Sequence, residues 1–527
     1  MIESAATTAN ELIYHRLLLP MVARQPDAPC TTNAATGETR TFGQHLERVK
    51  LAIGGLRALG VERGDRFALM MMNSAEFLEL EHAALLGGGV VNPLNLRFAP
   101  KELAYVIKDS GTKVCFVDKI FAPLIDAVKA DAGLEHVILV GDGDVPHTGT
   151  YDKMLATATS TLPDEGIESD PAILMYTGGT TGLPKGVLLS QRAQALNNYH
   201  FMMTMQFSRT TKYLLQTPMF HAASTFAMLG VPAAGGHLVL LPMFEPAAAM
   251  QAMRTYKPNM TAMVPTMIGM TVAHPDFTPD SLETFTDLAY GASPMPAVLL
   301  DKLLALYPGM NLWQAYGMTE ASTGLTLLRP EDHRAGGSLL LSAGSPLPGV
   351  VLSIQDEEGN HLATGETGEV CARGGNYMIE YWNKPDATEE VFKGGWYHTG
   401  DAGYVDDRGY LFLVDRVKDM IVTGGENVYS AEVENAVASH PAVLQVAVIG
   451  IPSDAWGEAV HAVVVLREGA QATAADIIAH TRESIAGYKV PKSVDFRAEP
   501  LPLSGAMKVL KRELRAPFWE GHERSVG

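Results

Sequence analysis

Residues 176–187 read YTGGTTGLPKGV, a stretch rich in glycine and threonine that contains one lysine, Lys185. It follows a short apolar run at residues 172–175, which predicts a strand, and it precedes a helix expected from Ser190. Glycines let a backbone turn tightly and bring its N–H groups close to an anion, while threonine hydroxyls add donors and lysine adds positive charge. The stretch therefore predicts a loop that holds a polyphosphate.

The main competing interpretation of this stretch is a Walker A loop, in which serine or threonine follows the lysine at the start of a helix. Here Lys185 follows Pro184 and precedes Gly186, so the Walker pattern is not met. A flexible loop that binds nothing is the other alternative, and a generic run of glycine and threonine would allow it. The full string favours phosphate binding.

The residues before and after this loop alternate between short apolar runs and longer stretches with helical apolar spacing. Such alternation favours parallel sheets flanked by helices. Ser74 is a plausible N-cap of one of the helices. The pattern predicts helices at residues 41–59 and 74–86 and strands at 66–72, 90–93, 113–117 and 136–140.

The pattern of predicted secondary structure changes near Asp415. A β-rich stretch with glycine turns precedes this point, and about a hundred residues with a compact α/β pattern follow it. We place a domain boundary close to Lys418. The second part predicts helices at residues 430–439 and 474–485 and strands at 443–449, 459–466 and 493–497.

Length and charge restrict the class of protein. A single core rarely exceeds ~250–300 residues, so a chain of 527 residues is expected to form at least two domains. Its 40 Lys and Arg against 59 Asp and Glu give a net charge of −19, which argues against general binding of nucleic acid or anionic membranes. A few local cations and backbone N–H groups can still hold an anionic small ligand.

Cysteine usage and hydropathy indicate where the protein works. Cys30, Cys115 and Cys371 are far apart and lack metal-type spacing, which disfavours a disulfide framework or a zinc site and favours the reducing cytosol. The N-terminus lacks the pattern of a secretory signal. The longest apolar stretch, residues 227–244, contains proline and glycine breakers, so we expect buried strands and turns there instead of a membrane-spanning helix.

The loop at residues 176–187 resembles the phosphate loop of the adenylate-forming enzymes, which include acyl-CoA synthetases, coumarate-CoA ligases, firefly luciferase and peptide-synthetase adenylation domains. The resemblance recurs in order over nearly the whole chain. It implies an α/β fold with a large N-terminal domain, residues 1–417, built of parallel-sheet α/β subdomains and a β-rich subdomain. A small mobile C-terminal α+β domain, residues 418–527, would pivot on a hinge near Lys418.

The same resemblance assigns the nucleotide-binding residues. The run QAYGMTE at residues 314–320 is similar to the second nucleotide motif, YHTGD at 397–401 to the ribose motif, and GGENVYSAEVE at 424–434 to the segment beside a thiol channel. Taken singly, such motifs are also compatible with capped turns or surface ion pairs. The residues expected to bind ATP or CoA are Thr177, Gly178, Gly179, Thr180, Thr181, Lys185, Gly291, Ala292, Ser293, Tyr316, Gly317, Asp401, Arg416, Gly424 and Gly425.

The resemblance gives some of the site residues a specific role. Tyr316 would stack on adenine and Asp401 would accept hydrogen bonds from the ribose hydroxyls. Arg416 would contact ribose or phosphate. Glu320 and Thr177 are the expected ligands of Mg²⁺, a cation that prefers oxygen donors.

The residues expected to be catalytic are Lys508, Thr319, Glu320 and His221. Lys508 aligns with the catalytic lysine of the family, although Met507 stands where the family usually has glycine. Lys511 is a less favoured substitute. His221 would lie beside the substrate carboxylate, and a buried structural histidine is the alternative.

The resemblance implies an ATP-dependent acyl-CoA synthetase that uses ATP, Mg²⁺ and CoA. A carboxylic acid would form acyl-AMP with release of pyrophosphate, and CoA would then displace AMP. An adenylating enzyme that serves a carrier protein, a luciferase-like oxygenase and a non-catalytic nucleotide-binding regulator are the alternatives. A fatty or bulky aromatic acid is favoured because the presumed pocket shows no cation. We expect no nucleic-acid partner and no integral membrane association, and a homodimer is an expectation from the family.

Overall fold

The computed structural model describes residues 12–177, 183–416, 420–423, 426–453, 456–505 and 507–520, without the side chains of residues 415, 416, 426 and 427. Several residues singled out by the sequence lie outside this description. These are Gly178, Gly179, Thr180, Thr181, Lys418, Gly424, Gly425 and the side chain of Arg416.

The first large sheet carries the loop quoted above. Its strands lie in the order β19-β9-β8-β4-β3-β5-β6-β7 and are parallel from β8 through β7, whereas β9 and β19 run antiparallel at one edge. Parallel pairing follows from the helical crossovers between successive strands. The strands are β3 (Arg66–Met70), β4 (Val90–Pro93), β5 (Val114–Asp118), β6 (His136–Val140), β7 (Gly149–Thr150), β8 (Pro171–Thr177), β9 (Lys185–Ser190) and β19 (Glu380–Tyr381).

The second large sheet follows the same plan. Its order is β16-β15-β14-β13-β12-β10-β11-β1-β2, with parallel pairing from β14 through β1. The strands are β1 (Pro29–Asn33), β2 (Thr39–Thr41), β10 (Lys212–Leu215), β11 (His237–Leu240), β12 (Met260–Met263), β13 (Asp287–Gly291), β14 (Asn311–Tyr316), β15 (Thr326–Leu328) and β16 (Ser345–Pro346).

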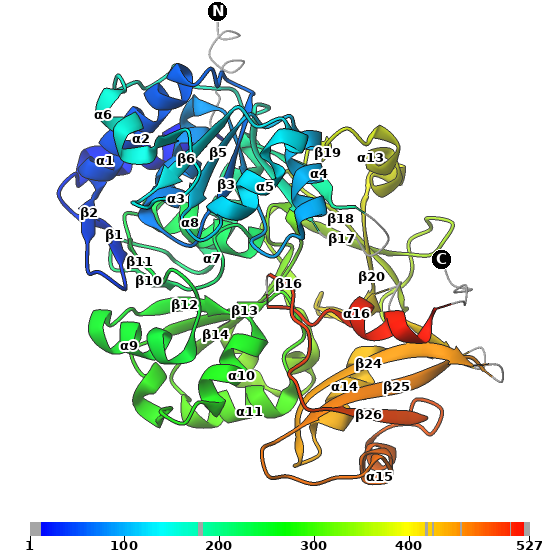
Figure 1. The fold of residues 1–527 in the computed structure, drawn as a ribbon. Helices are drawn as coiled ribbons and strands as arrows, with labels where there is room; N and C mark the ends of the chain where they lie inside the picture. The colour runs from blue at the N-terminus through cyan, green and yellow to red at the C-terminus, as the bar shows by residue number, and fades with distance from the viewer. Residues whose placement is uncertain are drawn as a thin grey trace, which may run out of the picture.

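The helices cover both faces of these sheets, as Figure 1 shows. They are α1 (Tyr14–Arg24), α2 (Phe42–Ala58), α3 (Ala75–Ala83), α4 (Pro100–Ser110), α5 (Ala122–Ala132), α6 (Tyr151–Thr157), α7 (Gln191–Thr204), α8 (Ala222–Ala233), α9 (Pro246–Tyr256), α10 (Pro265–Ala273), α11 (Ala297–Leu306), α12 (Pro330–Ala335) and α13 (Pro385–Val391).

Successive side chains along a strand point into different hydrophobic cores, and this alternation defines the layers of the fold. In β3, Phe67 and Leu69 enter a central core shared with α1, α2, α3 and α8, while Ala68 and Met70 enter an outer core with α4 and α5. In β10, Leu214 faces a further core that contains residues of α9, α10 and α11. Each parallel strand therefore buries both of its faces, which explains why these strands read as continuous apolar runs.

Two smaller sheets complete the fold. One has the order β17-β18-β20-β21 and is antiparallel; the other joins β23-β22-β25-β24, with β26 paired to β25. Their strands are β17 (Val351–Gln355), β18 (Gly368–Arg373), β20 (Tyr397–Val405), β21 (Leu411–Arg416), β22 (Ile421–Thr423), β23 (Glu426–Val428), β24 (Val443–Ser453), β25 (Gly457–Leu466) and β26 (Ser493–Arg497).

The last sheet has helices on both faces. Helices α14 (Ser430–Ala438) and α15 (Ala474–Ser484) contribute to one core, and α16 (Lys511–Arg515) contributes to the other. The helices and strands predicted after residue 430 are thus confirmed, as is the α/β fold class with a small C-terminal α+β unit. The boundary at residue 418 stays a prediction.

Several local predictions are confirmed by capping contacts. Ser74 accepts a hydrogen bond from the Phe77 N–H at 3.0 Å and Ser190 accepts one from the Ala193 N–H at 3.1 Å, as N-cap residues do. The helix predicted at residues 74–86 ends at Ala83, because Leu86 and Gly87 in the following π-turn leave helical geometry.

One local prediction is wrong, and one strand was not predicted. Residues 227–244 do not form only strands and turns, since their first part belongs to α8, which is buried between the two large sheets and tolerates Pro232 near its end. The strand β9 was not foreseen between the loop and α7. It places Lys185 at the start of an antiparallel strand opposite Thr177.

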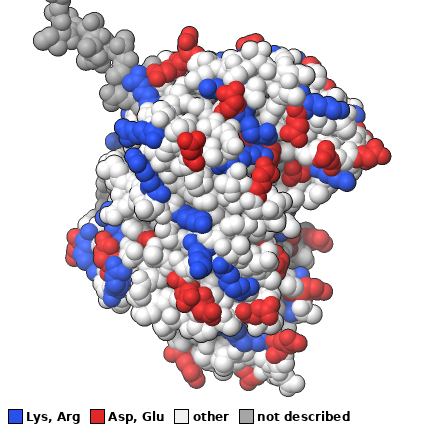
Figure 2. All heavy atoms as spheres, turned by 90° about the vertical axis from the view of Figure 1, so that its left-hand side faces the viewer, with Lys and Arg blue, Asp and Glu red and all other residues white. Residues whose placement is uncertain are grey.

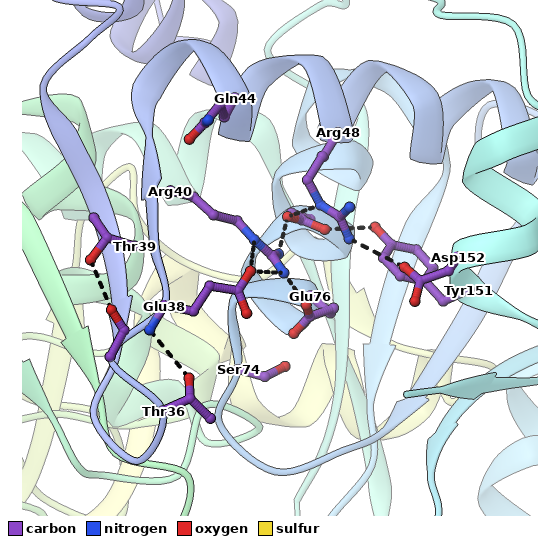
Figure 3. Close-up of polar contacts among 12 residues, drawn as sticks. Thr36, Glu38, Thr39, Arg40, Gln44, Arg48, Ser74, Glu76, Tyr151 and Asp152 are labelled. Carbon is purple, nitrogen blue, oxygen red and sulfur yellow. Dashed lines mark hydrogen bonds and ion pairs between the residues drawn. The ribbon is translucent and has the colours of Figure 1, made fainter. Parts of the chain in front are cut away.

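The large domain also contains a buried ion-pair network, shown in Figure 3. Glu79 on α3 is fully buried, and its carboxylate accepts hydrogen bonds from Arg40, from Arg48 at 2.7 Å and from the Tyr151 hydroxyl at 3.0 Å. Arg40 also pairs with Glu76. The network fills the space between β2, α2, α3 and α6, and its opposite charges pair with one another.

The surface charges and the hydropathy of the helices are consistent with the amino-acid composition. On the face shown in Figure 2, basic and acidic side chains are interspersed. In the described part of the chain, no helix has the length and apolarity needed to cross a bilayer.

Candidate active site

A large cavity opens at the carboxyl ends of the parallel strands and extends to the C-terminal segment. Its volume is about 3220 Å³, well above the ~300–1,000 Å³ of a pocket for a drug-sized ligand. The described residues predicted for the site all line it: Thr177, Lys185, His221, Gly291, Ala292, Ser293, Tyr316, Gly317, Thr319, Glu320, Asp401 and Lys508.

The β8–β9 hairpin brings two of these residues to the cavity. Thr177 and Lys185 are directly opposite each other in the antiparallel register, so they flank the two ends of the glycine-threonine loop. The Tyr176 hydroxyl donates a 2.6 Å hydrogen bond to Asp109 on α4, which fixes the hairpin to the outer helix layer. The loop between the two strands lies outside the described residues.

A tyrosine connects Lys185 to the carboxylate predicted to bind metal. The Lys185 ammonium lies 4.8 Å from the centre of the Tyr381 ring, and the Tyr381 hydroxyl donates a 2.8 Å hydrogen bond to Glu320 Oε1. Tyr381 belongs to β19, which pairs with β9. This arrangement orients the Glu320 carboxylate at the cavity wall, where its oxygen atoms can coordinate a divalent cation.

The predicted adenine and ribose residues meet through a second tyrosine. The Tyr316 hydroxyl at the end of β14 donates a 2.6 Å hydrogen bond to Asp401 Oδ2 on β20. Burial, with the Asp401 charge as the next cause, raises the pKa of Tyr316 well above its usual value. The phenol is therefore a hydrogen-bond donor at neutral pH and holds the Asp401 carboxylate beside the Tyr316 ring.

The backbone around this pair is tightly packed. A Cβ at Gly317 would lie 1.9 Å from the Thr323 carbonyl oxygen, so only glycine fits there without a shift of the chain. Ala292 has φ +67°, a left-handed conformation that turns the chain after β13 toward the cavity. The small residues predicted from the sequence thus meet a real steric demand.

His221 is the N-cap residue of α8. Its Nδ1 accepts a 3.1 Å hydrogen bond from the Ala223 N–H, so the ring hydrogen is on Nε2 when the imidazole is neutral. Burial, and secondarily the charge of Lys508, lower the pKa of His221 to about 3. His221 is therefore neutral at physiological pH, and its Nε2–H is a donor for an anionic group.

The C-terminal segment that carries Lys508 docks on the large domain. Thr266 Oγ1 donates a 2.8 Å hydrogen bond to the Met507 carbonyl, and the Arg97 guanidinium donates to the Leu503 carbonyl. Within the segment, the Lys508 N–H donates to Ser504 Oγ at 3.1 Å. These contacts bring Lys508 to the same cavity as His221.

Met507 occupies the position where the sequence departs from the family pattern. Its φ is +62°, in the left-handed region that glycine adopts without penalty and that costs other residues roughly 1 kcal/mol. Its side chain packs against the core beside α10 and α11. Met507 therefore has a strained backbone conformation at a position where glycine would have none.

Sequence reasoning missed Tyr381 and Arg97. Both act over long sequence separations, Tyr381 on Glu320 and Arg97 on Leu503, so no local spacing marks them. Thr266 lines the cavity, and its bond to the Met507 carbonyl was not foreseen. The only signal for Tyr381 in the sequence was its place at the start of the aromatic run YWN, residues 381–383.

One wall of the cavity is free of ionic side chains. Between residues 201 and 299, the lining contains His221 and otherwise uncharged residues. Phe201 and Phe226 stack there with ring centres 4.5 Å apart. This wall can accommodate an uncharged, bulky group but offers no counter-ion for a second carboxylate.

Comparison with known proteins agrees with this geometry. The family model for the AMP-binding enzyme matches residues 20–382, and the model for the AMP-binding enzyme C-terminal domain matches residues 432–508. The chain belongs to the AMP-binding enzyme family. It lies in the acyl-CoA synthetase branch of these adenylate-forming enzymes, as the resemblance implied.

Three curated relatives align over nearly the whole chain. A feruloyl-CoA synthase of Amycolatopsis sp is 36% identical over 94% of this chain and 98% of its own length. The long-chain-fatty-acid–CoA ligase FadD13 of Mycobacterium tuberculosis is 35% identical over 92% and 94%. The fatty acid–[acyl-carrier-protein] ligase ScoC of Streptomyces coeruleorubidus is 34% identical over 93% and 94%.

A solved structure is similar over the same extent. The crystal structure of ATP-bound MatB from Rhodopseudomonas palustris is 29% identical, with a TM-score of 0.86 that covers 98% of this chain and 100% of that chain. The similarity includes the small C-terminal unit as well as the large domain.

Proposed function

We propose that this protein is an ATP-dependent acyl-CoA synthetase for a fatty or bulky aromatic carboxylic acid. It joins the acid to AMP with release of pyrophosphate and then transfers the acyl group to CoA with release of AMP. The observation that carries the proposal is the convergence of Lys185, Glu320, Asp401, His221 and Lys508 on one cavity. The uncharged wall between residues 201 and 299 supports the choice of acid.

The residues around the cavity suit the first half-reaction. The acid attacks the α-phosphorus of ATP, so two anionic groups must approach each other. Lys508 provides positive charge at the place where they meet, and the His221 Nε2–H donates to the carboxylate. Thr319 donates to the α-phosphate, while Thr177, Lys185 and the loop at residues 178–181 hold the outer phosphates. Asp401 accepts from the ribose.

Mg²⁺ fits the oxygen donors at this cavity. Glu320, oriented by Tyr381, and Thr177 would hold the ion. When bound, the ion supplies charge neutralisation between the phosphates. Removal of Mg²⁺ with EDTA should abolish pyrophosphate release, and restoration of Mg²⁺ should recover it.

The second half-reaction requires a different arrangement of the small domain, residues 418–527. Lys508 is docked through Thr266 and Arg97, so in this arrangement the cavity is set for adenylation. We expect the small domain to rotate about Lys418 so that Gly424 and Gly425 line the path of the CoA thiol. The preceding residues 1–417 would stay as one unit.

A panel of carboxylic acids tests the proposal. Each acid is incubated with ATP and Mg²⁺, and pyrophosphate release, AMP and thioester are measured with free CoA or with a holo acyl-carrier protein. We expect turnover with long-chain or aryl-propenoic acids and thioester formation on CoA. If thioester formed only on the carrier protein, the carrier protein and not CoA would be the acceptor. Tight ATP binding without turnover of any acid would contradict the proposal. Sedimentation of the same sample tests the expected homodimer.

A further inference from the structure

A second group of ligand-type side chains lies on the β18–β20 pair, at the edge of the cavity. Cys371 on β18 is the direct cross-strand partner of His398 on β20. Glu369 lies two residues before Cys371, so all three side chains leave the same face of the sheet. One ligand atom from each of the three lies within 4.8 Å of the other two.

The hydrogen bonds of His398 define its tautomer. Its Nε2 is 3.2 Å from the Lys393 carbonyl oxygen, which can only accept, so Nε2 carries a hydrogen. Its Nδ1 is 2.8 Å from Glu369 Oε2 and 3.4 Å from Cys371 Sγ. Three electron-rich atoms thus converge on one point, where a positive charge, either a proton or a metal ion, must lie between them.

We propose that Glu369 Oε2, Cys371 Sγ and His398 Nδ1 form a binding site for a thiophilic divalent cation, of which Zn²⁺ is the probe. The three donors are zinc ligands, and water would complete the tetrahedron. Tetrahedral bonds of ~2.0–2.3 Å place neighbouring ligand atoms about 3.3–3.7 Å apart. The distances of 2.8 and 3.4 Å approach this, so small side-chain rotations suffice.

The surroundings of the three ligands match those of a metal centre. A metal-bound histidine usually donates its other N–H to a carbonyl or a carboxylate, as His398 does to Lys393. The Gly400 N–H donates a 3.0 Å hydrogen bond to Glu369 Oε1, which orients that carboxylate. On binding, the Cys371 thiol proton and the proton shared by His398 Nδ1 and Glu369 Oε2 are released to solvent, and thiolate and carboxylate balance the charge of the ion.

The site is distinct from the proposed magnesium position and is connected to the ribose residue. Glu369 and His398 line the cavity, so an ion can reach them, whereas Cys371 is buried behind them. The Asp401 N–H donates to Thr399 Oγ1 at 3.1 Å, and Thr399 donates to the Val370 carbonyl at 2.7 Å. A metal ion that clamps β18 to β20 would therefore change the geometry of the strand that carries Asp401.

Binding of Co²⁺ and Zn²⁺ to the full chain tests the site without any assay of activity. We expect one Co²⁺ per chain with a near-ultraviolet thiolate-to-cobalt absorption band, which Zn²⁺ removes by competition. Cys371→Ser should abolish the band, and His398→Gln, which removes a direct ligand, should weaken Zn²⁺ binding by at least the ~10–100-fold that loss of an outer-shell partner costs. Cys30→Ala, which removes a buried thiol on β1, is the matched control and should keep both signals.

Melting curves of each variant establish that it is folded, and Glu369→Gln serves as a second variant if Cys371→Ser does not fold. A cobalt band that survives in Cys371→Ser, or no stoichiometric binding of Zn²⁺ to the wild type, would overturn the proposal. The consequence for catalysis rests on the proposed function: Zn²⁺ should raise the KM for ATP several-fold in the wild type and in Cys30→Ala, but not in Cys371→Ser. Loss of that effect alone, with binding intact, would refute only the coupling to Asp401.

Discussion

The Glu79 network and the nucleotide cavity use the same chemical groups in opposite ways. Glu79 is fully buried and accepts hydrogen bonds from two arginines and a tyrosine, so its charge is paired within the protein. Glu320 accepts a hydrogen bond from one tyrosine hydroxyl and lines a large cavity. A carboxylate paired with arginines stabilises the fold, whereas Glu320, oriented by a neutral phenol, keeps its charge at the cavity wall for a ligand.

The difference shows that a hydrogen bond from a neutral donor can orient a carboxylate without neutralising its charge. An arginine at Glu320 would compete with a cation, because the charge of the carboxylate would already be paired. A tyrosine positions the carboxylate and leaves the negative charge in place. The structure therefore separates charges that fold the protein from charges that act on a ligand.

The largest expected effect is a loss of stability when Glu79 is replaced. Glu79→Gln removes the buried carboxylate that the partly buried Arg40 and Arg48 share and should lower the free energy of unfolding by about 3–5 kcal/mol. Glu38→Gln removes an exposed partner of the same Arg40 and should cost about 0–1 kcal/mol. Chemical denaturation of both variants measures the contrast; equal losses would contradict the structural role of burial.

The next effect is on catalysis, at Lys508. Lys508→Ala should lower acid-dependent pyrophosphate exchange about 10²–10³-fold, because the positive charge beside the reacting anions is lost. The same variant should still convert a supplied acyl-adenylate to thioester. Lys511→Ala is the comparison, since Lys511 pairs with Glu434 at 2.7 Å inside the small domain. If Lys511→Ala abolished exchange and Lys508→Ala did not, the assignment of Lys508 would be wrong.

A smaller effect should come from the tyrosine that orients Glu320. Tyr381→Phe keeps the ring beside Lys185 but removes the donor to Glu320, which should lower kcat/KM about tenfold and raise the Mg²⁺ concentration for half-maximal rate. Tyr377→Phe is the control, because the Tyr377 hydroxyl has no hydrogen-bond partner among the described residues. A magnesium dependence unchanged by Tyr381→Phe would show that the hydroxyl does not orient Glu320.

The smallest effect is expected at Met507, whose backbone is strained. Met507→Gly removes both the side chain and the left-handed strain, whereas Met507→Ala removes only most of the side chain. The adenylation rate of the glycine variant should exceed that of the alanine variant about threefold to fivefold, which corresponds to about 1 kcal/mol. Equal rates in single-turnover adenylation would indicate that the strain at residue 507 does not affect docking of Lys508.

Local sequence patterns were sufficient for most of the fold. Apolar runs between helical stretches predicted the parallel strands, because strands buried on both faces contain little else. Ser74 and Ser190 marked helix starts, because their side chains satisfy N–H groups that the first turn leaves unpaired. The same approach was wrong at residues 227–244, since periodicity cannot distinguish a fully buried helix from buried strands.

For the site, motif spacing identified the residue types, and the resemblance to a known family supplied their roles. The sequence by itself determined an acidic α/β protein with a phosphate-type loop, a compact C-terminal unit and a lysine near its end. Only the tertiary structure decided which groups face one another: Tyr316 with Asp401, Tyr381 with Glu320, and Cys371 with His398. The reason is physical, because such pairs depend on strand register and sheet order, which no local stretch of residues encodes.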